Sequence, residues 1–229
     1  MTIINKVETI RVALPFETGG PRVGMRPALD AWMAMESVMV RIETADGLEG
    51  WGEAFGHLMA PASEAALHGV VAPLLLGKDA RPIAKRIDEI ERQLHGLGRS
   101  GPAMYALSAL DIALWDLAGK RAGLPVFELL GGGDGELTRY ASLMRYGGDT
   151  AAVAANVTRA RQCGFTTIKL HESTIAAFRA ARSSVDKEDN ICLDVNCPWT
   201  ISEARTVARE IREDDFHWLV LPVASGSRY

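Results

Sequence analysis

Two short apolar segments in the second half of the chain end in side chains that can do chemistry. Lys169 and His171 close the first segment, and Asp194 and Asn196 close the second. Imidazole serves as a general base near neutral pH, because a free histidine already titrates at about 6.5. A carboxylate such as Asp194 is the kind of ligand that Mg²⁺ prefers, and an ammonium neutralises negative charge on a substrate. The residue types therefore point to proton transfer beside a cation.

The local pattern predicts how these side chains are brought together. Residues 166–171 and 191–196 are predicted strands, in which alternate side chains share a face, so each polar pair shares one face. The stretch between them, 173–190, has about the length of a crossover helix, which makes the strands parallel neighbours. We therefore expect their polar carboxyl ends to lie side by side.

Other roles are open to the same residues on sequence alone. A histidine at a strand end such as His171 is often a structural residue held by hydrogen bonds. Asp194 has the alternatives of capping a helix or forming a salt bridge.

The first half of the chain predicts an antiparallel sheet followed by helices. Apolar and polar residues alternate in its strands, and Asp46-Gly47 indicates a turn between two of them. Ser63 is the predicted N-cap of the first helix, and leucines at three- and four-residue spacing mark the last one. The predicted strands are residues 4–14, 38–44 and 48–53, and the predicted helices are 63–76, 82–95 and 103–121.

The second half alternates strands and helices, which is typical of a parallel α/β structure. Thr200 and Glu203 form a capping box at the start of one helix. The glycines at 131–133 follow a helix and precede a strand, which is the wrong order for a phosphate-binding loop. The predicted strands are 137–144, 166–171, 191–196 and 218–223, and the predicted helices are 150–163, 173–185 and 200–214.

A doubly wound sheet and a (β/α) barrel both fit this alternation. Functional side chains at the carboxyl ends of successive strands favour the barrel, and no G-x-G-x-x-G follows the first strand. We expect an α/β protein with an α+β domain over residues 1–130 and the first part of a barrel over 131–229, with about four strands.

The composition is that of an ordinary globular protein, with 48% hydrophobic and 24% charged residues among 229. A formal net charge of −4 without basic runs argues against a nucleic-acid partner. Charged residues interrupt any signal-peptide core, and the longest apolar run, 70–76, is too short to span a bilayer. Three cysteines without CxxC spacing favour reduced thiols. We expect a cytoplasmic protein with no membrane partner.

Several motifs resemble those of the mandelate racemase and muconate lactonizing branch of the enolase superfamily. The resemblance covers the whole chain, and the motifs are specific only in combination. They are Gly50-Trp51-Gly52-Glu53, the stretch ALSALDIALWDLAGK at 106–120, Leu129-Leu130-Gly131-Gly132 and the two strand ends.

The resemblance implies a capping domain over a modified (β/α) barrel, bound Mg²⁺, and removal of the proton alpha to a carboxylate. Matching the motifs makes Asp194 a metal ligand and Asn196 its polar neighbour. It makes Lys169 the electrostatic partner and His171 the base. Dehydration of a sugar acid or hydroxy acid is the expected reaction, with racemisation or epimerisation as alternatives. The substrate is then a small carboxylate.

Substrate selection in this family falls to loops of the capping domain. The long loop over residues 16–27, which we expect to be flexible, carries Arg22 and Arg26, and His57 follows the third predicted strand. These three are candidates for substrate contacts, although loop arginines are more often simply solvated.

The chain departs from the family pattern at two places. The family usually has a second lysine where this chain has His171, which changes the reach and charge of the base. The family's fourth strand reads Trp-Leu-Glu-Glu-Pro, and its first glutamate binds magnesium. This chain has Val220 there, and valine cannot coordinate a cation.

These departures leave a second interpretation of function. With Val220 in the metal site and about four of a barrel's eight strands, we expect the chain as written to be inactive. Unpaired strand edges favour pairing with another copy, so we expect a homo-oligomer. The alternative to an enzyme is therefore an inactive relative that acts as an oligomerising or regulatory fragment.

Overall fold

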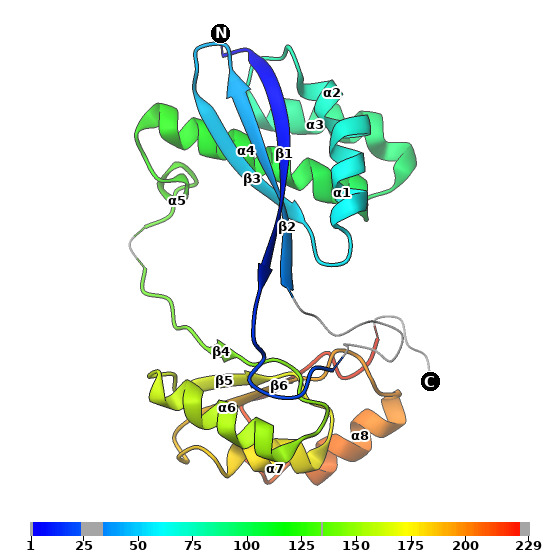
Figure 1. Cartoon of the computed structure of the whole chain (residues 1–229), viewed down its shortest axis with the longest axis vertical. Helices are drawn as coiled ribbons and strands as arrows, with labels where there is room; N and C mark the ends of the chain where they lie inside the picture. The colour runs from blue at the N-terminus through cyan, green and yellow to red at the C-terminus, as the bar shows by residue number, and fades with distance from the viewer. Residues whose placement is uncertain (1, 24–33, 134, 225–229) are drawn as a thin grey trace. The chain divides into compact units, whose positions relative to one another are not determined.

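The computed structural model describes residues 2–23, 34–133 and 135–224, and the chain divides into two compact units (Figure 1). Unit 1 comprises Met1–Phe16 and Ala34–Gly135, and unit 2 comprises Glu17–Met33 and Glu136–Tyr229. Among the described residues, no helix is both long enough and apolar enough to cross a membrane.

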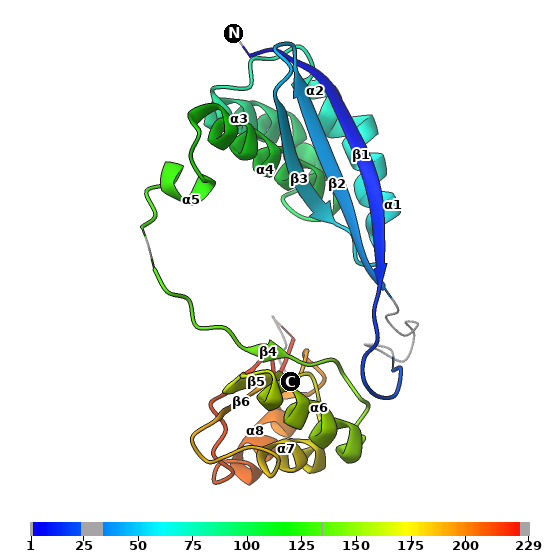
Figure 2. The same ribbon diagram turned by 60° about the vertical axis from the view of Figure 1, so that its left-hand side comes forward.

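Unit 1 is an antiparallel sheet with helices on one face (Figure 2). β2 is the central strand, and Val38, Val40 and Ile42 on it are fully buried under the helices. This alternation of buried and partly exposed residues is the period-two pattern of a half-buried strand. The strands are β1 (Ile4–Pro15), β2 (Ala34–Thr44) and β3 (Glu49–Phe55).

The longest helix of unit 1, α4 (Pro102–Ala122), holds the core together. Its leucines at 107, 110, 114 and 117 are buried, as their spacing predicts. Gly123 then ends the helix in the left-handed conformation, with φ of 67°. The other helices are α1 (Ala60–Ala66), α2 (Ala72–Leu75), α3 (Ile83–Leu94) and α5 (Val126–Leu129).

β3 lies directly against the backbone of α4, and glycine is required for this contact. A Cβ on Gly50 would lie 2.2 Å from the Ala113 carbonyl oxygen, and one on Gly52 would lie 2.0 Å from that of Ala109. Between the two glycines, the Trp51 N–H donates to Asp116 Oδ2 at 2.7 Å. The Gly-Trp-Gly motif is therefore a docking surface for a helix.

Unit 2 is a parallel sheet in which the strand order equals the chain order, β4-β5-β6-β7. Its helices pack on one face of the sheet, where they bury an apolar cluster that includes Ile168, Leu193 and Phe178. The strands are β4 (Ala141–Ser142), β5 (Thr167–Leu170), β6 (Asn190–Asp194) and β7 (Trp218–Val220), and the helices are α6 (Thr150–Gln162), α7 (Ile175–Arg182) and α8 (Ile201–Glu210).

The order of the elements and the α/β class are as expected, and the capping box of Thr200 and Glu203 is confirmed. Several local predictions are wrong, among them a helix N-cap and the extent of a strand. Ser63 lies inside α1 and donates to the Phe55 carbonyl at 2.7 Å, while Met59 is the N-cap. The strand predicted at 137–144 shrinks to the two residues of β4, because the rest of that stretch forms no ladder with β5.

Candidate functional site

The carboxyl ends of β5 and β6 form the candidate site. The two strands are parallel and adjacent, with Lys169 in register with Cys192. Their apolar residues Ile168 and Leu193 are buried in the cluster shared with the helices. Side chains alternate along a strand, so Lys169 and Asp194 point to the opposite face. His171 and Asn196 lie just beyond the ends of the two strands. Below, "the rim" means Lys169, His171, Asp194 and Asn196.

A largely buried ion pair joins the two strands at the rim. Lys169 Nζ lies 2.9 Å from Asp194 Oδ2, with 19% and 8% of the two side chains exposed. The salt-bridge role considered for Asp194 from the sequence is thus present. Lys169 Nζ also lies 6.0 Å from the centre of the Tyr140 ring, within reach of a cation–π interaction.

His171 points toward the same carboxylate oxygen, at the end of β5. Its Nδ1 lies 2.6 Å from the Leu143 carbonyl oxygen, and its Nε2 lies 3.8 Å from Asp194 Oδ2. A carbonyl oxygen only accepts hydrogen bonds, so Nδ1 carries the hydrogen. In the neutral ring Nε2 then holds the lone pair.

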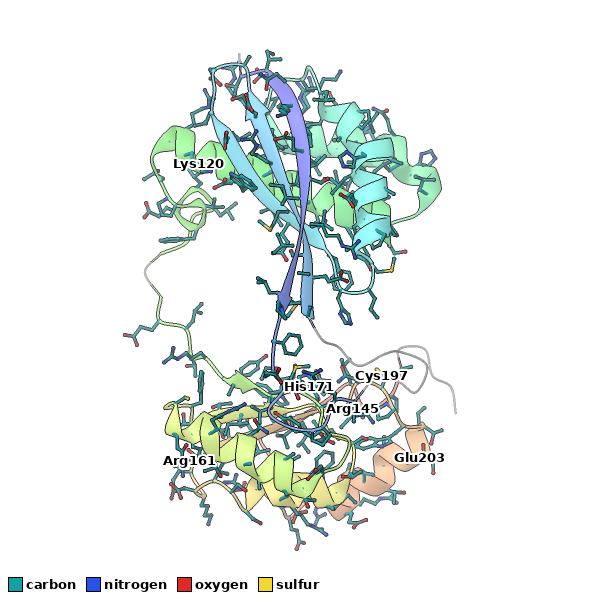
Figure 3. All side chains as sticks on the ribbon, viewed as in Figure 1. Lys120, Arg145, Arg161, His171, Cys197 and Glu203 are labelled. Atoms are coloured by element: carbon teal, nitrogen blue, oxygen red, sulfur yellow. The ribbon has the colours of Figure 1, made fainter. Side chains whose placement is uncertain are left out.

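Asn196 reaches Asp194 through its backbone rather than its side chain. The Asn196 N–H donates to Asp194 Oδ1 at 3.1 Å. Asn196 and Cys197 both have positive φ, 55° and 58°, so the chain turns sharply after β6. Figure 3 shows His171 and Cys197 on the side of unit 2 that faces away from α7.

Apolar and neutral groups on β6 and β7 border the rim. Val220 of β7 is the register partner of Asp194, and Trp218 is that of Cys192. Burial raises the pKa of the Cys192 thiol to about 11, although the Lys169 charge acts in the opposite direction. A thiol with this pKa is neutral at physiological pH and is a poor nucleophile.

The rim does not by itself fit a magnesium ion. Magnesium is usually held by one or two carboxylates with waters and substrate oxygens in an octahedron. Across the described ranges, no three His, Cys, Asp or Glu side chains gather at one point. Asp194 is already compensated by the Lys169 ammonium, and the side chain of its neighbour Val220 has no oxygen. We therefore derive no chemical step through a metal from these residues.

The substrate-contact candidates Arg22 and His57 belong to different units. Arg22 is in unit 2 and forms an exposed ion pair with Glu17 at 3.3 Å. His57 belongs to unit 1, where its ring packs edge-on against Phe55 with centres 6.4 Å apart. Arg26 lies outside the described residues.

Two groups beside the rim could not be predicted from the sequence. The Leu143 carbonyl that receives His171 belongs to the backbone, so no side-chain pattern marks it. Glu172 directly follows His171 and is only 2% exposed. A glutamate is rarely this buried without a partner, so burial is the signal that identifies it.

Family models match both units. Residues 17–131 match the N-terminal domain of mandelate racemase / muconate lactonizing enzyme, and residues 152–227 match the enolase C-terminal domain-like model. The expected combination of a capping domain and part of a barrel is thereby confirmed.

Curated relatives include a cycloisomerase and a dehydratase that are named for sugar acids. The 3,6-anhydro-alpha-L-galactonate cycloisomerase of Streptomyces coelicolor is 33% identical over 84% of this chain and 55% of its own. Arabinonate dehydratase of Saccharolobus solfataricus is 30% identical over 78% of this chain and 50% of its own. The chain thus spans about half the length of the curated relatives it matches.

Solved structures share the fold at high similarity. A racemase from Streptomyces coelicolor A3(2), solved with bound magnesium, superposes with a TM-score of 0.86 at 30% identity. The match covers 97% of this chain and 63% of that one.

Proposed function

This chain belongs to the mandelate racemase and muconate lactonizing enzyme family, and from that premise we propose that its rim serves removal of the proton alpha to the carboxylate of a sugar acid or hydroxy acid. Dehydration is the proposed outcome, because a relative is named for dehydrating arabinonate. Racemisation and epimerisation begin with the same proton removal.

One observation supports the proposal: a cation and a base converge on a single carboxylate oxygen. Lys169 Nζ and His171 Nε2 lie 2.9 and 3.8 Å from Asp194 Oδ2. An ammonium has three donors, and Asp194 occupies one of them, so Lys169 can also bind a substrate carboxylate. In the proposed step the His171 Nε2 lone pair accepts the alpha proton.

The alpha proton of a carboxylate is very weakly acidic, so its removal needs positive charge near the developing enediolate. Magnesium is the cofactor bound in the structural relative. Among the described residues, only Asp194 of the rim carries a carboxylate. The proton transfer is therefore assigned to Lys169 and His171 alone.

A second candidate is a relative that binds the acid without turning it over. Val220 favours it, because this residue stands in register with Asp194 where the family resemblance implies a glutamate. A valine there gives a dication no ligand and contributes no charge to the enediolate. Self-association and a regulatory role stay predictions of this candidate.

Binding and exchange measured on one sample test both candidates. We expect arabinonate or another sugar acid to shift the ring signals of His171 saturably in NMR spectra, while arabinitol, which lacks the carboxylate, does not. Lys169→Met should abolish the shift. Exchange of the alpha proton in heavy water with Mg²⁺ separates the candidates. Proton removal by His171 predicts exchange above the buffer rate, whereas the binding-only candidate predicts none, because one ammonium leaves the enediolate poorly stabilised.

The other outcomes are informative. Alpha-proton exchange that disappears in His171→Asn would show that this chain completes the reaction and would exclude the second candidate. If no sugar acid shifts His171, both candidates are contradicted.

A further inference from the structure

A buried carboxylate next to the proposed base has no role in the function described so far. Glu172 is 2% exposed. Its two oxygens accept backbone hydrogen bonds from one turn: Tyr146 N–H donates to Oε1, and Gly148 N–H donates to Oε2 at 2.8 Å. Bonds to a charged acceptor are stronger than neutral ones.

This turn follows β4 and has an unusual backbone conformation. Gly147 and Gly148 both have positive φ, 67° and 86°. Backbone N–H groups of a turn can point into one concavity, which favours an anion. The Glu172 carboxylate fills that place and fastens the turn to the end of β5.

Leu143, which directly follows β4, contacts His171 just upstream of the turn. Leu143 N–H donates to the Lys169 carbonyl at 2.9 Å, and the Leu143 carbonyl oxygen lies 2.6 Å from His171 Nδ1. The stretch 143–148 is thus held to β5 at both ends, by Leu143 and by the turn that binds Glu172.

We propose that Glu172 is a positioning residue for His171. By fixing the turn at 146–148, it keeps the Leu143 carbonyl in line with His171 Nδ1, so the ring presents Nε2 to the rim. The inference concerns the orientation of the ring and its tautomer, and it gains catalytic meaning only if the proposed function holds.

NMR of the ring nitrogens tests it on the full chain without substrate. At about pH 8.5, two units above the ordinary histidine pKa, the neutral ring of His171 should show a single tautomer with the hydrogen on Nδ1. A His171→Gln variant identifies its signals. In Glu172→Gln, which keeps the size but loses an acceptor and the charge, we expect a mixture of tautomers. We also expect about tenfold faster amide exchange at Tyr146 and Gly148.

Glu213→Gln is the matched control, because Glu213 is exposed in the same unit and pairs only loosely with Arg212 at 3.9 Å. It should leave both signals unchanged. Faster exchange in Glu172→Gln with an unchanged His171 tautomer would reduce Glu172 to a structural residue and overturn the proposal. A hydrogen on Nε2 in the native chain would overturn it even if the variant fails to fold. Absence of alpha-proton exchange would leave this result untouched.

Discussion

Asp194 is a carboxylate that the fold has largely removed from water and paired with one cation. Its side chain is 8% exposed, and the Lys169 ammonium lies 2.9 Å away. Removing one partner from a buried pair leaves the other charge without compensation, which costs more than the pair itself contributes. The Lys169 side chain therefore stabilises unit 2 as well as offering a binding group.

Lys169→Met tests this energetic role. We expect the free energy of unfolding of unit 2 to fall by about 3 kcal/mol, because the Asp194 charge stays buried. Amide hydrogen exchange at Leu193 and at other β6 residues measures the change. Lys187→Met, at an exposed position of the same unit, is the control. Adding Asp194→Asn to Lys169→Met should recover part of the loss, and equal losses in the two single lysine variants would contradict the argument.

The proximity of the rim side chains could be predicted from the sequence, because strand alternation and the length of a crossover helix determine it. Lys169, His171 and Asp194 lie together as expected, and their chemical roles stay predictions. The Leu143 carbonyl could not be predicted, since every residue carries a carbonyl. The contact of Asn196 through its N–H, rather than its side chain, depends on a left-handed turn that the residue type alone does not determine.

At the scale of elements, β3 and α4 make a close backbone contact in unit 1. Gly50 and Gly52 allow it, and Asp116 ties the strand to the helix through the Trp51 N–H. Lys120, labelled on α4 in Figure 3, adds a bond from Nζ to the Glu49 carbonyl at 2.9 Å. Leucine spacing predicted α4 itself. That spacing does not indicate what the helix packs against. The reason for glycine at positions 50 and 52 therefore becomes clear only from the structure.

Gly52→Ala should disrupt this contact. The added Cβ would lie 2.0 Å from the Ala109 carbonyl, so β3 and α4 must separate. We expect unit 1 to lose about 2–3 kcal/mol of unfolding free energy, measured by urea unfolding with Trp51 and Trp115 fluorescence. Gly69→Ala is the control, because a Cβ there meets no atom within 4 Å. Equal stability of the two variants would show that the contact relaxes without cost.

At the scale of the whole molecule, the two units are not two consecutive halves of the chain. Residues 17–23 come between two strands of unit 1, yet they pack in unit 2. Asn156 of α6 holds them, with Nδ2 donating to the Gly19 carbonyl at 2.8 Å, and Thr18 is only 8% exposed. The described part of the segment expected to be a flexible loop, 16–23, forms no helix or strand, and its flexibility stays a prediction. Side-chain bonds to a remote carbonyl leave no periodic signal in a sequence.

Asn156→Ala should release this segment. The variant loses the bond to Gly19, and we expect trypsin to cleave after Arg22 several-fold faster in the native state, measured by mass spectrometry. Thr158→Ala is the control, because Thr158 is exposed on the same helix. An unchanged cleavage rate in Asn156→Ala would show that other contacts, such as those of Gly20 with Tyr146, are sufficient.

The strand order of unit 2 has a consequence for synthesis on the ribosome. Each strand from β5 to β7 pairs with the strand made just before it, and residues 17–23 are made before all of them. When each of these strands emerges from the exit tunnel, the preceding strand with which it pairs is therefore already outside. We expect unit 2 to assemble stepwise during translation, one βα pair at a time, rather than waiting for the last strand.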